Sequence, residues 1–339
     1  MSFAPRRLGF AAAAMIAASA APAAAFTVVP YFDSTITGAG NATDIEASIN
    51  AAVAVYSTMF TDPGTVNIVF KLGSTGLAAS SNLMYTLSYA NFTNLLAIDS
   101  ATNPTNTVLP VALAHLSSGN GADGSVNVWA TSAQLRVGLG VSSAHPCFDA
   151  SGATALNSNS TACIGTYDGV VTLSNSAPID FLRPISGSTY DAFALVQHEV
   201  DEVLGAGGPA TTLGTFAPTC SALNPSRYGV LDLYRYSAPG TPSYSNCGSD
   251  SSYLSFDGGT TSIVAFNQTA GADYADLGPS GYVQSAFGSP GLQLGISTSS
   301  PEFLMLQSTG YDPVPEPATM ALFGFGLVGL AAARRRRAG

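Results

Sequence analysis

The segment 188–205 constrains the fold most, because it places acidic residues inside the apolar pattern of a helix. Its apolar side chains recur at the three- and four-residue spacing of a helix face, at Phe193, Val196, Val200, Val203 and Leu204. Ser188 and Asp191 resemble a capping box at its start, and Gly205 stands where a C-terminal glycine belongs. Four potential metal or proton ligands lie within five residues, although only 9% of the chain is charged. Since an unpartnered buried carboxylate is costly, the pattern predicts a helix whose acids bind something.

The spacing inside this cluster indicates a metal site. Residues four apart on a helix share one face, so His198 and Glu202 can both bind one ion. Glu199 takes the place of the glutamate in the H-E-x-x-H pattern, which acts as general base on a metal-bound water. Asp201 is the fourth member of the cluster. The alternative interpretation is a solvated acidic helix face with a chance histidine, because H-E-x-x-E is a loose pattern.

Four stretches of the chain carry a recognisable set of motifs: residues 190–193, 198–205, 231–240 and 256–259. They resemble a family of exported metalloproteases that carry a PEP-CTERM sorting signal, and the likeness extends from about Phe26 to Asp312. The resemblance implies a zincin-like or metzincin-like α+β fold. In such a fold an N-terminal mixed sheet and an active-site helix are followed by an irregular C-terminal lobe.

The resemblance also implies roles for individual residues. His198 and Glu202 are expected to bind the metal, with Glu199 as the catalytic base. Relatives with a fuller H-E-x-x-H-x-x-G motif have a third histidine far downstream, where this chain has the aspartates of residues 271–278 instead. We therefore expect Asp276 to be the third ligand. A metzincin has its third histidine at the position of Gly208, which has no side chain to offer.

Two other aspartates remain candidates for the third ligand. Asp232 lies in the apolar run 230–233, where an aspartate is costly unless it bonds something. It can equally pair with Arg235 or Arg227. Asp273 is a further candidate close to Asp276.

The donor set bears on the identity and reactivity of the metal. A catalytic zinc needs three protein ligands and an open position for water, and both histidine and carboxylate are acceptable donors. Each anionic ligand lowers the positive charge that the water feels, so the pKa of the water falls less. Oxygen ligands also favour manganese or calcium relative to zinc. We expect a divalent cofactor, with zinc first and manganese or calcium as alternatives.

Both ends of the chain look like targeting signals. Residues 1–25 combine Arg6 and Arg7, an apolar run and a small-residue cleavage site, as a secretory signal peptide does. Residues 314–339 contain Pro-Glu-Pro, an apolar segment and four arginines from Arg334 to Arg337, which resembles a PEP-CTERM signal. An ordinary C-terminal anchor is the alternative, although the segment is barely long enough to span a bilayer. We expect a metalloprotease-like domain at 26–313, a secreted or envelope location, and a transient inner-membrane anchor processed by an exosortase-type partner.

Composition restricts the partners of the domain. Between Phe26 and Asp312 there are one lysine and four arginines against twenty acidic residues. A net charge near −15 argues against binding nucleic acid or anionic lipid, because their phosphates need cationic side chains.

The four cysteines fit an oxidising compartment. Cys147 pairs most simply with Cys163, and Cys220 with Cys247, although three connectivities are possible. A zinc-thiolate site is the rival interpretation, but no C-x-x-C pair is present.

Local patterns predict the elements outside the acidic helix. We expect strands at 26–32, 66–70, 126–129 and 169–173, and helices at 43–60, 89–100, 110–116 and 302–308, with a capping box at 43–46 and a loop up to Asn82.

These patterns together predict an exported peptidase that hydrolyses polypeptides with a metal-activated water. A catalytically inactive, metal-binding or adhesive protein of the extracellular matrix is the alternative. The remaining histidines are weaker candidates: His115 has the setting of a structural residue, and His145 that of a turn. A Gly-x-Ser-x-Gly nucleophile motif is absent from the sequence.

Overall fold

The computed structural model describes residues 26–116, 127–142, 144, 166–208, 227–244, 249–269, 271–278 and 281–315. All four cysteines and His145 lie outside these residues, as do the predicted signal peptide and almost all of the predicted tail. The two disulfides and the cleavage site therefore stay predictions.

A four-stranded mixed sheet forms the centre of the N-terminal part, in the order β1-β2-β6-β3. The strands β1 (Thr27–Phe32), β2 (Thr65–Gly73) and β6 (Gly169–Ser174) run parallel. Strand β3 (Ala78–Asn82) pairs antiparallel with β6 and forms one edge of the sheet. The predicted mixed sheet is confirmed.

Strand β3 corrects the prediction of a loop up to Asn82. Its sequence, Ala-Ala-Ser-Ser-Asn, has neither β-branched residues nor apolar alternation, so no local signal marks it. The backbone pairing with β6 supplies the order that the side chains do not specify. This strand matters for function because part of it lines the cavity described below.

All five predicted helices are present among the described residues, but the starts of some of them differ, and a short first helix and a π-helix at Gln134–Gly138 were not predicted. Helix α2 (Ala42–Met59) begins after Asn41, so the predicted capping box at residues 43–46 is wrong, and no side chain caps this helix end. The other helices are α1 (Ser34–Thr37), α3 (Tyr89–Thr102), α4 (Val108–His115), α5 (Ala192–Leu204) and α6 (Pro301–Ser308). His115 at the end of α4 bonds the carbonyl of Val111 through Nδ1 at 2.8 Å, as a structural residue does.

Outside the main sheet and the α-helices, the described chain contains several short strands. Strands β4 (Met84–Ser88), β5 (Asn127–Thr131) and β9 (Arg227–Gly229) form one sheet. A C-terminal sheet has the order β11-β10-β12-β13, with β10 (Arg235–Ala238), β11 (Thr241–Pro242), β12 (Tyr253–Leu254) and β13 (Val264–Ala265). Strands β7 (Ile179–Asp180) and β8 (Tyr190–Asp191) pair just before α5. The short strands after α5, from β9 to β13, fall in the irregular C-terminal region that the sequence predicted.

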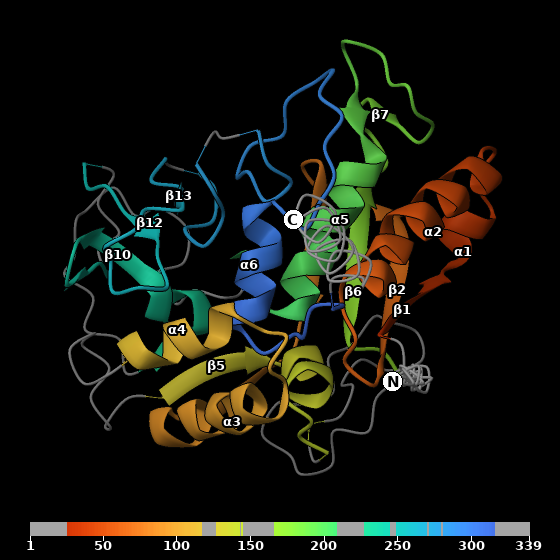
Figure 1. The fold of residues 1–339 in the computed structure, drawn as a ribbon. Helices are drawn as coiled ribbons and strands as arrows, with labels where there is room; N and C mark the ends of the chain where they lie inside the picture. The colour runs from red at the N-terminus through yellow and green to blue at the C-terminus, as the bar shows by residue number, and fades with distance from the viewer. Residues whose placement is uncertain are drawn as a thin grey trace, which may run out of the picture.

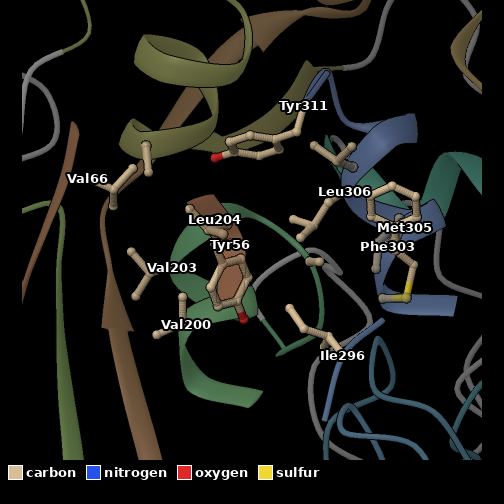
Figure 2. Close-up of a cluster of buried hydrophobic side chains, with 14 of the residues drawn as sticks. Tyr56, Val66, Val200, Val203, Leu204, Ile296, Phe303, Met305, Leu306 and Tyr311 are labelled. Atoms are coloured by element: carbon tan, nitrogen blue, oxygen red, sulfur yellow. The ribbon is translucent and has the colours of Figure 1, made fainter. Parts of the chain in front are cut away.

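The main core encloses α5 on two sides. In Figure 1 the main sheet and α2 lie on one side of α5, and α6 lies on the other. Figure 2 shows Val200 and Val203 directed toward Val66 of β2, with Tyr56 of α2 beside Leu204. Residues of and around α6 close the cluster from the opposite side, among them Phe303 and Leu306 in Figure 2. Because the side chains of α5 interlock with three other elements, the helix is a rigid support for the polar residues on its remaining face.

The described chain is thus a mixed α/β structure with several sheets and helices. Within the described residues, no helix combines the length and the apolar character needed to cross a membrane.

Candidate metal centre

Helix α5 is fixed at both ends by contacts that the sequence only partly revealed. Asp191 is its N-cap residue but makes no cap bond. Its carboxylate instead accepts from Nε of Arg183 at 3.0 Å and from Nη2 of the same side chain. The predicted capping box from Ser188 is therefore wrong, because Arg183 takes the carboxylate. The predicted glycine end is confirmed, since Gly205 ends the helix in the left-handed conformation with a φ of 100°.

The polar residues of α5 divide between two environments. Asp201 is fully buried against α2, where it accepts a hydrogen bond of 2.7 Å from the hydroxyl of Tyr56. His198, Glu199 and Glu202 instead line a cavity of about 790 Å³. Strand β3 and residues within 271–276 and 281–289 supply much of the rest of its wall. The cluster read from the sequence thus contains three residues that face the cavity and one structural carboxylate.

The imidazole of His198 is oriented by the protein backbone. Its Nδ1 lies 3.0 Å from the carbonyl oxygen of Val283. A carbonyl oxygen only accepts hydrogen bonds, so Nδ1 carries the proton and Nε2 of the neutral ring carries the lone pair. Nε2 lies 3.7 Å from Oε1 of Glu202 and 3.7 Å from Oδ2 of Asp276. This is the orientation of a metal-ligating histidine whose other nitrogen is held by a backbone carbonyl.

Glu202 is held by two donors. Ser80 on β3 donates to its Oε2 at 2.5 Å, and the backbone N–H of Gly208 donates to its Oε1 at 3.1 Å. A Cβ at position 208 would lie only 2.3 Å from that Oε1. The position where a metzincin has its third histidine therefore contributes a backbone donor in this chain, and a side chain there would force the carboxylate of Glu202 to shift.

Asp276 meets the other two predicted ligands. It comes from the segment 271–278, is buried, and accepts a hydrogen bond of 3.0 Å on Oδ1 from the amide of Gln284. One ligand atom from each of His198, Glu202 and Asp276 can be chosen so that all three lie within 4.8 Å of one another. One imidazole nitrogen and two carboxylate oxygens form a donor set that suits a divalent ion.

The two alternative third ligands, Asp232 and Asp273, have different surroundings in the structure. Asp232 is buried in the short 3-10 helix Val230–Tyr234, and its Oδ2 accepts from the backbone N–H of Gly229 at 2.9 Å. Burial lowers the pKa of Arg235 to about 10, and the charge of Asp232 counteracts this shift. Asp232 is not a member of the group around His198. Asp273 does line the cavity, and burial together with the charge of Asp276 raises its pKa.

The catalytic candidate Glu199 lies beside the group rather than in it. Only 5% of the residue is exposed, and it lines the same cavity. Burial raises the pKa of Glu199 to about 7, while the positive charge of His198 acts in the opposite direction. A carboxyl group with a pKa near neutrality suits general acid and base chemistry.

The charges of the group favour a cation. Burial raises the pKa of Glu202 and of Asp276, so their ionised forms are costly without a positive partner. Burial alone would lower the pKa of His198, but Asp276, Glu199 and Glu202 together raise it to about 10. Several carboxyl groups thus compete for one imidazole, and a divalent ion would neutralise the excess negative charge.

Sequence reasoning missed three contributors to this centre. Ser80, Val283 and Gln284 bond Glu202, His198 and Asp276 respectively. No local sequence pattern distinguishes these three residues from other serines, valines and glutamines of the chain. Only the tertiary structure brings them to the helix.

Comparison with known proteins identifies the tail of the chain. The family model of the PEP-CTERM protein-sorting motif matches residues 313–337. The match confirms an exported protein with a transient membrane anchor that an exosortase-type enzyme processes. No curated protein and no solved structure matches the chain.

Proposed function

We propose that this protein is an exported, zincin-like metal-dependent peptidase. The observation that carries the proposal is the convergence of His198, Glu202 and Asp276 in one cavity, with Glu199 lining the same cavity. The three ligands come from two segments that are more than 70 residues apart in the chain. The H-E-x-x-E pattern and the geometry of the cavity therefore support the same assignment.

Each residue of the centre has a chemical role in this proposal. His198, through Nε2, and the carboxylates of Glu202 and Asp276 would hold the ion, which is zinc or, given the oxygen donors, manganese or calcium. A bound divalent ion acts as a Lewis acid and lowers the pKa of a water molecule. Glu199 accepts the proton of the attacking water and returns it to the leaving amine, as a carboxyl group with a pKa of about 7 can do near neutral pH.

The walls of the cavity support an extended polypeptide as the substrate. Ala78, Ala79 and Ser80 of β3 line it, and within the described residues β3 has a strand partner on one side only. An extended peptide can pair its backbone with such an edge strand. Apolar side chains of Leu77 and Phe287 line the same cavity and would contact side chains of the peptide.

The second candidate function is a non-catalytic cation-binding or adhesive protein of the extracellular matrix. The observation in its favour is the donor set, because Glu202 and Asp276 replace the imidazoles of a typical peptidase site. Two anionic ligands weaken the activation of water by the ion. Such a centre can bind a cation without turning over a substrate.

Cleavage of a denatured protein substrate separates the two functions. The peptidase proposal predicts cleavage that a chelator stops and that falls by about 10²–10⁴-fold in Glu199→Gln. Metal content should remain unchanged in this variant, because Glu199 is not one of the three ligands. Glu46→Gln, on α2, is the matched control and should cleave like the unmodified protein. Undiminished cleavage in Glu199→Gln would refute the assigned base, and metal binding without cleavage of a broad peptide library would establish the second function.

A further inference from the structure

The amide of Gln284 lies at the point where two of the three proposed ligands converge. Its Nε2 is 3.2 Å from Nε2 of His198 and donates to Oδ1 of Asp276 at 3.0 Å. The side chain is fully buried, and its Oε1 has no hydrogen-bond partner among the described residues. A buried amide oxygen without a partner is uncommon and needs an explanation.

The backbone of Gln284 is fixed from both sides. Its N–H donates to Oε1 of Glu302 at 2.8 Å, and its carbonyl accepts from Leu277 at 2.8 Å. The preceding carbonyl, of Val283, holds His198. The residue therefore cannot leave the centre without disrupting His198 and the segment that bears Asp276.

Close packing also confines the end of the side chain. A Cβ at position 207, which is occupied by Gly207, would lie 2.1 Å from Nε2 of Gln284. Because both the backbone and the surroundings are fixed, the simplest motion left to the amide is rotation about its last carbon-carbon bond. A half-turn exchanges the oxygen and the nitrogen.

The two orientations of the amide suit two states of the centre. In the orientation described here, the NH2 group donates to the carboxylate of Asp276 and lies beside Nε2 of His198. After a half-turn, Oε1 would face the carboxylate of Asp276, which is repulsive unless a positive ion lies between the two oxygens. With an ion present, the amide oxygen is attracted to it, and oxygen donors of this type bind manganese and calcium well.

We propose that Gln284 is a fourth protein ligand, which turns its amide and binds the ion through Oε1 when the centre is loaded. The inference rests on the metal site of the proposed function. It adds a neutral oxygen to the two carboxylates, so the number of oxygen donors rises without more negative charge. It also assigns the metal-free role of the amide, which is to hold the carboxylate of Asp276 in place beside His198.

Titration calorimetry with manganese on the full chain tests the inference through two substitutions. Gln284→Leu removes both amide groups, so manganese should bind about 10–100-fold more weakly. Gln284→Glu removes the NH2 group but keeps an oxygen donor. Because the donor is kept, this variant should bind manganese at most about tenfold more weakly than the unmodified protein. Gln307→Leu is the control, because Gln307 is also buried but lies on α6 and does not bond the centre.

The visible spectrum of bound cobalt supplies a second readout that does not depend on activity. Gln284→Leu should change the spectrum because a ligand is lost, and Gln284→Glu should keep oxygen coordination. Equal weakening in both variants would overturn the inference, because it would show that only the NH2 group matters. An unchanged affinity and spectrum in Gln284→Leu would overturn it as well. Thermal unfolding of each metal-free variant excludes misfolding as the cause.

The same experiment separates this inference from the proposed function. If the unmodified protein binds no ion, both fail together. If it binds an ion and Gln284→Leu leaves that binding intact, the inference alone fails. If Gln284 proves to be a ligand and no peptide is cleaved, the inference stands and the peptidase assignment fails.

Discussion

Two groups of buried carboxyls in this protein differ in what they can do. The metal centre combines Glu202 and Asp276 with the imidazole of His198, at the wall of a cavity. The second group, here called the C-terminal acid cluster, consists of Asp62, Asp99 and Asp312. Burial raises the pKa of these carboxyls to about 8, 6 and 7 respectively. Both groups therefore favour a proton or another positive charge.

The C-terminal acid cluster lacks what makes the first group a site. It contains no histidine, and none of its members lines the cavity beside α5. Its carboxyls accept hydrogen bonds from the protein, as Glu202 and Asp276 also do: Asp62 accepts from the backbone N–H of Asp312 at 2.9 Å, and Asp99 accepts from Asn103 at 2.7 Å. Buried carboxyls alone therefore only bind protons more tightly. The metal centre differs because an oriented imidazole, converging oxygens and an open cavity would allow it to bind a metal ion and a substrate.

The two groups also differ in position along the chain. The C-terminal acid cluster fixes the end of the folded domain, where Thr61 donates to the carbonyl of Asp312 at 2.9 Å and Val314 donates to that of Met59 at 2.7 Å. The sorting motif matches from residue 313 onward. The cluster thus lies next to the tail that is processed, while the metal centre lies on the rigid helix α5.

The largest expected effect comes from exchanging one carboxyl in each group for an amide. Asp276→Asn replaces an anionic ligand of the metal centre, and metal affinity should fall by about 100-fold, which is about 2.7 kcal/mol. Asp62→Asn makes the same chemical change in the C-terminal acid cluster and should leave metal affinity unchanged. Titration calorimetry of both variants measures the difference. Equal losses would erase the distinction between the two groups.

The pH dependence of the free energy of unfolding should distinguish the two groups through a substitution in the C-terminal acid cluster rather than in the metal centre. The pKa of Asp62 is about 8 in the folded state and near 3.8 in the unfolded state, so the folded state binds the proton more tightly. Its contribution to stability is complete below pH 4 and is lost as the pH rises through about 8. Asp62→Asn should therefore flatten the curve of unfolding free energy between these limits, by up to about 1.4 kcal/mol per pH unit where Asp62 titrates. Denaturant unfolding at several pH values tests this, and an unchanged slope would contradict the assigned pKa.

The smallest expected effect concerns the backbone donor of the metal centre. In Gly208→Ala the new Cβ would lie 2.3 Å from Oε1 of Glu202, so the carboxylate must move. We expect manganese to bind about tenfold more weakly, a loss typical of residues that orient a ligand. Gly76→Ala is the matched control, because Gly76 lines the same cavity and a Cβ there meets no atom within 4 Å. Similar affinities in the two variants would show that Gly208 does not position Glu202.

The sequence predicted the fold best where a single helix face carries the pattern. Helices α2 and α5 were recognisable from their apolar spacing, which reports burial directly. Their starts were not, because helix ends depend on which side chain is available for capping. At α5 the carboxylate of Asp191 is taken by Arg183, a contact that no local pattern contains. Strand β3 was missed because its small polar residues are ordered by pairing with β6 alone.

The candidate site shows the same limit. His198, Glu199 and Glu202 were predicted because their spacing is local, and Asp276 because of a resemblance to a family pattern. Ser80 and Gln284 are far from α5 in the sequence and reach the centre only through β3 and through the segment fixed by Glu302. Residues that orient a site from other elements are therefore the part that sequence reasoning finds last.

Metal analysis of the purified protein, with and without His198→Ala, is the decisive test of the metal centre. We expect one divalent ion per chain in the unmodified protein and a large loss of that ion in the variant, because His198 is the single imidazole of the group. Circular dichroism should show that the variant keeps its helices. Metal that remains stoichiometric after His198→Ala would contradict the assignment of the centre.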